Sequence, residues 1–170
     1  PGGEWLYAKL YTGSATADGL LRDLVAPLVE GADQWFFIRY GDPDWHIRLR
    51  IRGADVLGAL HAACATEFER GRLWRLQLDT YEREVERYGG PRAIGLAERL
   101  FTSDSEAALA VVRDLGGDAG AELRWRAALL GIDLLFDDLG LPLEARRAVA
   151  RRAREGYGRE FGADGAFRRE

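Results

Sequence analysis

Hydrophobic and polar positions in the first half of the chain follow two periods. Four strands are predicted, at 4–11, 34–40, 45–53 and 72–81. In these short runs, apolar residues either alternate with polar ones or follow one another directly. Between them, apolar residues recur at every third or fourth position, which predicts two helices, at 17–31 and 54–71. Pro27 is expected to bend or end the first helix, and the segment GDPDW joins the second and third strands as a hairpin turn.

The order of these elements, β-α-β-β-α-β, predicts an α+β fold of the ferredoxin-like type. In that arrangement an antiparallel sheet carries both helices on one face, and its other face stays open. The second helix should turn Val56, Leu57, Leu60, Cys64 and Phe68 toward the sheet. The fourth strand should place Trp74, Leu76 and Leu78 on one face.

From Pro91 onward the pattern is helical. We expect a helix start at Pro91, a capping box at Ser103–Glu106, a long helix over 118–139 that ends at Gly140, and a last helix after Pro142. The chain is therefore expected to be one domain, 1–170, with an α/β core over 1–90 and a helical part over 91–170.

Composition narrows the class of protein. The 170 residues are 47% hydrophobic, which suits a compact domain with its own core. The net charge of −4 argues against a general nucleic-acid binder, so no direct nucleic-acid partner is expected. Cys64 is the single cysteine, which excludes an internal disulfide and favours a cytoplasmic location. No apolar run approaches the roughly 18 residues of a membrane span, so no membrane role is expected.

The third strand carries the most unusual charge pattern. His46, Arg48, Arg50 and Arg52 alternate with aliphatic residues, so they should share the open face of the sheet. Guanidiniums roughly 7 Å apart along a strand repel one another unless an anion lies against them. Arginine offers a rigid fork of donors for carboxylates or phosphates, so the strand predicts a local anion site. The alternative interpretation is a solvated sheet face.

Neighbouring segments add charge to the same face. Alternation places Lys9, Arg75, Gln77, Asp79 and Tyr81 there, and the short turn should bring Arg39 and Tyr40 beside His46. The run 79–90 holds the acids Glu82, Glu84 and Glu86 interleaved with Arg83 and Arg87. These acids either neutralise the arginines next to them or, with Arg87, form a second wall of a pocket.

Other kinds of chemistry find little support. Two histidines and one cysteine, without a CxxC or HExxH pattern, make a zinc site improbable, and His61 is expected to be a partly buried structural residue. The glycine-rich segments match neither phosphate-loop nor dinucleotide patterns, so no cofactor is expected.

Three segments together resemble the C-terminal domain of lantibiotic dehydratases, which also occurs as separate thiopeptide-type bacteriocin biosynthesis proteins. They are WFFIRYGDPDWHIRLRIRG, LDTYEREVERYGG and AERLFTSDSEAAL, and the resemblance runs from about Trp5 to Phe161. It implies a lyase that eliminates glutamate from glutamylated Ser or Thr of a ribosomal precursor peptide, giving dehydroalanine or dehydrobutyrine. The implied partners are that peptide and a separate tRNA-dependent glutamylation protein, and the chain could form a homodimer.

The resemblance also implies roles for individual residues. Arg48, Arg50 and Arg87 match arginines linked to elimination, where they would hold the leaving glutamate and stabilise the enolate that forms. Eliminating members also use a histidine in a later helical segment of the type HM…NR, and this chain has no histidine after His61. His46 and Tyr81 are the candidates to replace it as catalytic groups. Arg39, Arg52, Lys9 and Glu84 are expected to bind substrate.

Two other functions remain open. Some relatives are thiopeptide pyridine synthases, which join two dehydroalanines in a formal 4+2 cycloaddition and expel the leader peptide. The chain could also be a non-catalytic peptide-binding subunit of a split dehydratase.

Overall fold

The computed structural model describes residues 3–53 and 56–160. The chain divides into two compact units, Pro1–Gly120 and Ala121–Glu170, which are treated separately.

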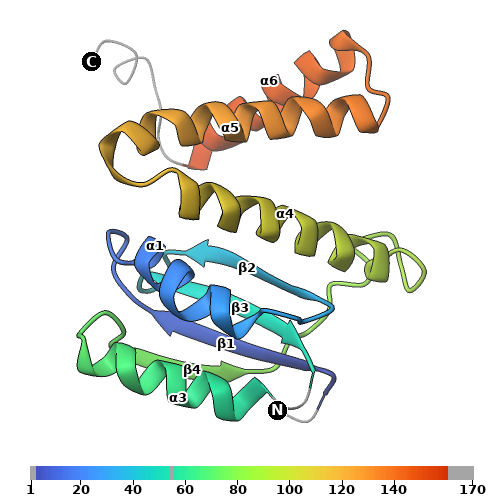
Figure 1. Cartoon of the computed structure of the whole chain (residues 1–170). Helices are drawn as coiled ribbons and strands as arrows, with labels where there is room; N and C mark the ends of the chain where they lie inside the picture. Colours follow the sequence, from blue (N-terminus) through green and yellow to red (C-terminus); the bar gives the residue numbers. More distant parts are fainter. Residues whose placement is uncertain (1–2, 54–55, 161–170) are drawn as a thin grey trace. The chain divides into compact units, whose positions relative to one another are not determined.

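The first unit is built on one four-stranded sheet (Figure 1). Its strands are β1 (Trp5–Tyr11), β2 (Trp35–Tyr40), β3 (His46–Arg52) and β4 (Arg75–Asp79). They lie in the order β2-β3-β1-β4, and every neighbouring pair is antiparallel. The predicted ferredoxin-like arrangement is confirmed, with β3 inserted between the first two strands of the chain.

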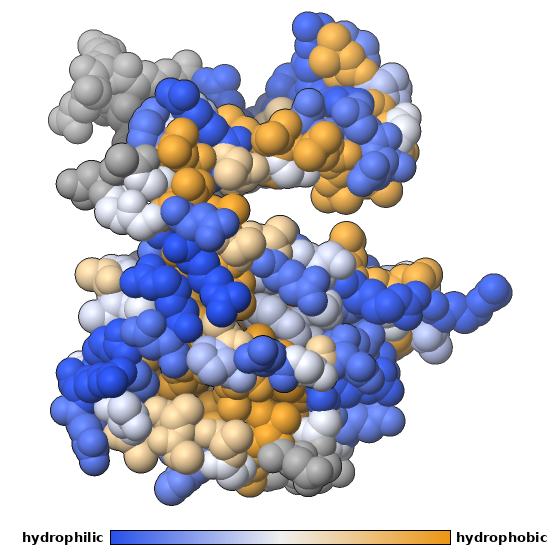
Figure 2. Space-filling view, viewed as in Figure 1, coloured by the Kyte–Doolittle hydropathy of each residue, from blue (hydrophilic) through white to orange (hydrophobic). Residues whose placement is uncertain are grey.

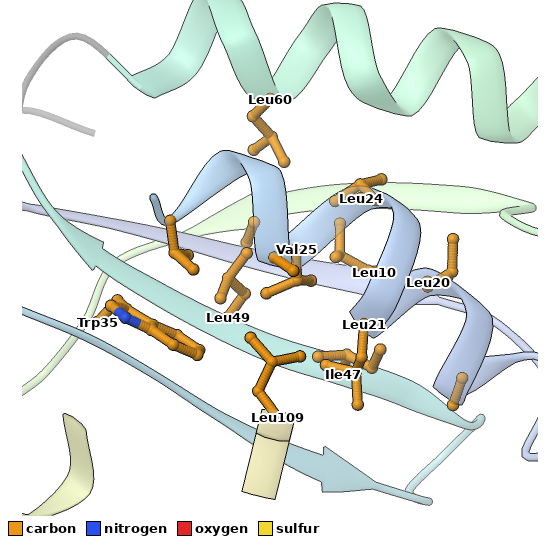
Figure 3. Close-up of a cluster of buried hydrophobic side chains, with 14 of the residues drawn as sticks. Leu10, Leu20, Leu21, Leu24, Val25, Trp35, Ile47, Leu49, Leu60 and Leu109 are labelled. Carbon is orange, nitrogen blue, oxygen red and sulfur yellow. The ribbon is translucent and has the colours of Figure 1, made fainter. Parts of the chain in front are cut away.

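Helices cover one face of this sheet (Figure 1). The first helical segment is continuous through α1 (Ala17–Leu20), the π-helical turn η1 (Leu21–Val25) and α2 (Ala26–Leu28), and α3 (Val56–Glu69) follows β3. Leucines of the first segment and of α3 pack on the aliphatic residues of β1 and β3, as Figure 3 shows. Each fully buried leucine or isoleucine contributes about 1.5–3 kcal/mol of hydrophobic stabilisation, so this cluster fixes the sheet.

The helix α4 (Ile94–Asp114) packs along β2, the strand at one edge of the sheet. Leu109 and Val112 join the core on the helix-covered side. The predicted capping box at Ser103–Glu106 is wrong, because these residues lie inside α4. Ser105 is buried, and its Oγ accepts a hydrogen bond of 3.1 Å from the backbone N–H of Phe37. The serine side chain therefore accepts a hydrogen bond from the edge strand β2 and does not cap a helix.

Several apolar residues of α3 and of the β4 segment lie at the surface, among them Leu57 and Phe68, which were expected to face the sheet. Leu57, Phe68, Trp74 and Leu78 are each more than a third exposed, because β4 forms the other edge of the sheet and α3 covers it only with its Leu60 and Cys64 side. His61 is exposed as well, so its prediction as a partly buried residue is wrong.

The second unit contains most of α5 (Gly117–Asp138), whose first turn lies in the first unit, and all of α6 (Leu143–Glu160). Gly140 has φ +64°, the left-handed conformation that ends a helix, as predicted. Arg146 of α6 links the two helices of this unit. It donates a hydrogen bond to the carbonyl of Leu141 in the connecting turn and forms ion pairs with Asp133 and Asp137 of α5. Many apolar side chains of this unit are exposed (Figure 2).

Within the described residues, no helix is both long enough and apolar enough to cross a membrane.

Candidate anion-binding site on the sheet

The sheet face that α1–α3 leave uncovered carries most of the polar side chains of the strands. Cross-strand partners in an antiparallel sheet share a face, so the pairs with His46, Arg48 and Arg50 define it. We call this surface the cationic face. Its members are Trp5, Tyr7, Lys9, Tyr11, Phe36, Ile38, Tyr40, His46, Arg48, Arg50, Arg52, Arg75, Gln77 and Asp79.

Arg48 lies at the centre of the cationic face, where one histidine and one aromatic ring hold it. Its Nε donates a hydrogen bond of 3.0 Å to Nε2 of His46. Its guanidinium lies 3.5 Å from the centre of the Tyr40 ring. A cation over an aromatic face gains about 0.5–2 kcal/mol and is held flat against it.

Arg50 lies one strand repeat further along, in a cage of aromatic rings. Its guanidinium carbon is 4.4 Å from the ring centre of Tyr7, 5.1 Å from that of Phe36 and 5.2 Å from that of Tyr81. Burial lowers the pKa of Arg50 from its ordinary value, and its Nε, shielded from solvent, has no hydrogen-bond partner. Aromatic rings compensate only part of the hydration energy that a buried cation loses, so this guanidinium should still bind an anion favourably.

The chain after β4 forms a wall beside Arg50, and α4 holds this wall in place. Arg83 makes a two-pronged ion pair with the buried carboxylate of Glu98, at 2.7 and 2.6 Å. Tyr81 lies next to that pair. Burial, with the negative charge of Glu98, raises the pKa of Tyr81 to about 12. The phenol is protonated at neutral pH, as tyrosine ordinarily is, and its hydrogen bond with Glu98 contributes to the raised pKa, so it is a poor proton acceptor.

A pocket of about 150 Å³ opens between this wall, β2, β3 and α4. Arg50, Tyr81 and Glu84 line it, together with residues absent from the sequence-based prediction of the site, among them Phe36, Tyr88, Phe101 and Asp104. Phe101 contacts the rings of Phe36 and Tyr88, at 5.3 and 5.1 Å between ring centres. The segment LFTSDSEA held the missed signal, since its aromatic residue and acid are three positions apart and thus share one side of a helix.

Arg87 stands at the outer side of this wall, paired with Glu84 at 2.7 Å. The Arg87 side chain is 71% exposed, and its hydrogen bond with Glu84 raises its pKa. An exposed pair of this kind contributes little to stability, so Arg87 can turn to a ligand at small cost.

Three predicted binding residues have partners of their own. Arg39 lies at the same end of the hairpin as His46, as expected, but on the helix-covered face, where it pairs with Asp18 of α1. Arg52 is held at the rim by Gln34 and Glu4, at 2.8 and 3.0 Å. Lys9 pairs with Asp79 at 2.5 Å, and this hydrogen bond lowers the pKa of Asp79.

Arg48 and Arg50 differ from these residues in their charge balance. Within 3–53 and 56–160, neither forms an ion pair with a carboxylate. The site thus contains two neighbouring cations without an ion-pair partner among the described residues, beside a pocket with aromatic and acidic walls. Glu84 and Asp79 act on them only through longer-range charge interactions. Among the same residues, no group of three or more His, Cys, Asp or Glu side chains could hold a metal ion.

Comparison with known proteins gives a consistent set of matches. A family described as lantibiotic biosynthesis dehydratase, C-terminal, matches residues 5–170. The subtilin biosynthesis protein SpaB of Bacillus subtilis is 36% identical over 120 residues, which cover 65% of this chain and 12% of SpaB. The nisin biosynthesis protein NisB of Lactococcus lactis subsp. lactis is 33% identical over 129 residues, 69% of this chain and 13% of NisB. The chain thus spans about an eighth of the length of these relatives.

Two solved structures are similar to this one. The tRNA-dependent lantibiotic dehydratase MibB from Microbispora sp. 107891 superposes with a TM-score of 0.62 at 38% identity, over 66% of this chain and 12% of that chain. The crystal structure of TsrL superposes with a TM-score of 0.53 at 21% identity, over 92% of this chain and 56% of that chain, and shares the fold.

Proposed function

Because this chain belongs to the family of lantibiotic biosynthesis dehydratase C-terminal domains, we propose that it is a lyase that eliminates glutamate from glutamylated Ser or Thr. The substrate is a ribosomal precursor peptide, and the product residue is dehydroalanine or dehydrobutyrine. The observation that carries this proposal is the pair of arginines, Arg48 and Arg50, that lack a carboxylate partner beside a walled pocket.

The chemistry of elimination fits such a site. A base removes the weakly acidic α-proton of the modified residue, the Cα=Cβ bond forms, and the Cβ–O bond breaks. The bonding electrons leave with the glutamate carboxylate. Negative charge develops first on the neighbouring peptide carbonyl and then on the leaving group. Cationic donors fixed in a poorly solvated site stabilise both charges without reorganising.

We assign each part of this reaction to particular residues of the site. Arg48 and Arg50 hold the free carboxylate of the glutamyl group and the developing charge, and Arg87 closes over the ligand from the rim. Tyr81, whose phenol is hydrogen-bonded to Glu98, packs its ring beside Arg50 and lines the pocket. Of the titratable groups that line the pocket, the carboxylates of Glu84 and Asp104 are the ones able to accept the α-proton.

The peptide must be glutamylated before it reaches this site. MibB, which shares the fold at 38% identity, is described as tRNA-dependent. We propose that a tRNA-dependent glutamylation activity supplies the glutamylated peptide to this site.

The decisive experiment mixes a glutamylated precursor peptide with the full chain and follows the peptide by mass spectrometry. Wild type should remove glutamate, and Arg50→Ala should slow the reaction by about 10²–10³-fold, as the loss of one charge-stabilising donor does. Arg70→Ala is the matched control, because Arg70 lies at the end of α3 and pairs with Glu67. It should react at the wild-type rate.

Other results would point to other functions. If the adduct survives wild type, elimination is excluded for this chain, and a doubly dehydrated peptide should then be offered. Release of a leader fragment would indicate the cycloaddition of a pyridine synthase. Binding without any change in mass would indicate a peptide-binding subunit.

A further inference from the structure

We propose that His46 is a positioning residue rather than an acid or base: it fixes the guanidinium of Arg48 so that its outer nitrogens face the substrate carboxylate. This inference rests on the proposed function for its kinetic meaning. Its structural part, a neutral histidine that accepts a hydrogen bond from Arg48, can be tested without activity.

The surroundings of His46 determine where its proton lies. The side chain is buried, with 2% of its surface exposed, and the ring lies between Tyr11 and Tyr40, with ring centres at 4.7 and 5.6 Å. Its Nδ1 is 2.7 Å from the backbone carbonyl oxygen of Asp44. A carbonyl oxygen can only accept, so Nδ1 carries the proton. The other nitrogen, Nε2, then presents a lone pair.

That lone pair is already used by Arg48. The Arg48 Nε–H donates to it at 3.0 Å. Both ring nitrogens of His46 therefore have partners within the protein, and neither is available to exchange a proton with a substrate. This arrangement distinguishes His46 from a general base, which needs its lone pair directed at the proton that it removes.

The consequence for Arg48 is a fixed orientation. Its inner donor points to His46 and its plane lies on the ring of Tyr40, 3.5 Å from the ring centre. Among the described residues, the Arg48 Nη atoms form no hydrogen bond or ion pair, so they remain free for an anion. Holding a donor in place before the charge develops is the main way in which an enzyme lowers the barrier to such a reaction.

Two substitutions separate positioning from the alternatives. In His46→Gln the amide oxygen can occupy the place of Nε2 and accept from Arg48, whereas in His46→Leu no acceptor remains. We expect His46→Leu to lower kcat by about 10–100-fold, with a smaller change in KM, and His46→Gln to stay within about fivefold of wild type. His61→Gln, at the exposed histidine of α3, is the control and should leave kcat unchanged.

The kinetic outcomes are distinct. An equal, large loss of kcat in His46→Gln and His46→Leu would make His46 a proton-transfer group and overturn the inference. Unchanged kcat in both variants, with only a lower Tm, would make it a packing residue and also overturn it. In an Arg48→Lys background, which lacks the Nε–H donor, His46→Leu should cause no further loss.

Nitrogen NMR of the full-length protein tests the structural part. The chain has two histidines, so the spectrum of His61→Gln reports His46 alone. We expect a neutral ring protonated at Nδ1, with a coupling across the hydrogen bond from Arg48 Nε to His46 Nε2. A ring protonated at Nε2 would overturn the inference even if elimination is observed. A wild type that shows this coupling but no elimination would refute the proposed function and leave the His46–Arg48 bond established.

Discussion

At the scale of single residues, arginines of one strand have different roles because their neighbours differ. Arg52 shares its strand and face with Arg48 and Arg50, yet it is neutralised by Glu4 and hydrogen-bonded to Gln34. Arg48 is oriented by a histidine, and Arg50 is enclosed by aromatic rings. Identical side chains with the same alternation thus provide one arginine with an ion-pair partner and two without one.

Tyr81 gives a prediction about alkaline pH. An unfolded chain ionises its tyrosines near 10.0, whereas the pKa of Tyr81 in the folded protein is raised to about 12. Above pH 10 the unfolded state therefore loses this proton first, and the free energy of unfolding should fall as the pH rises toward 12. After allowance for the partial exposure of the ring, we expect a fall of about 1 kcal/mol from this residue.

The measurement is urea unfolding between pH 9 and about 12. Tyr81→Phe should show a smaller fall than wild type, and Tyr157→Phe, at an exposed tyrosine of α6, should behave as wild type does. Identical pH profiles for all three proteins would contradict the raised pKa of Tyr81.

At the scale of elements, α4 links the core to the candidate site. Its apolar residues Leu109 and Val112 anchor the C-terminal half in the hydrophobic core. The N-terminal half presents Phe101 and Asp104 to the pocket, and its Glu98 holds Arg83 of the pocket wall. Ser105, between these halves, covers the unpaired edge of β2, which would otherwise expose a backbone donor.

Ser105→Ala tests this role of α4. The substitution leaves the half-buried N–H of Phe37 without its acceptor, which should lower the free energy of unfolding by about 1 kcal/mol. Ser103→Ala, on the exposed side of the same helix, should have almost no effect. Chemical denaturation of both variants measures their free energies of unfolding. Equal stability of the two would show that a water molecule accepts the hydrogen bond of Phe37 in place of the serine hydroxyl.

At the scale of the whole molecule, burial is distributed unevenly between the two units. The buried hydrophobic residues belong to the first unit, and no described side chain from 121 to 159 is buried. The sheet and its helices therefore provide the stable scaffold for the cationic face. The α5–α6 hairpin relies on helix propensity and exposed contacts, which give marginal stability by themselves.

Native-state hydrogen exchange should reflect this difference. We expect the slowest amides in β1 and β3, the two central strands, and exchange faster by at least about 10²-fold in α5 and α6, where local opening costs less free energy. Mass spectrometry of peptides from the two units measures this directly. Protection in α6 equal to that in β3 would mean that the hairpin is stabilised by contacts that its own residues do not supply.

The sequence by itself determined the strands, the helices of the core, the ferredoxin-like order and the face on which His46, Arg48 and Arg50 lie. These features follow from periodicities of two and 3.6 residues, which are local and can be read along the chain. The interior position of Ser105 was misread because a capping box and a buried helical serine have the same local sequence.

Only the tertiary structure decided which charges lack a partner. Arg52 with Glu4, Lys9 with Asp79 and Arg83 with Glu98 are separated by 48, 70 and 15 positions, and no local pattern reports such pairs. The same is true of the aromatic cage around Arg50, whose rings come from β1, β2 and the segment after β4. Ion pairing and burial depend on distance in space, so the candidate site took its final membership from the packing of β1, β4 and α4 around the arginine strand.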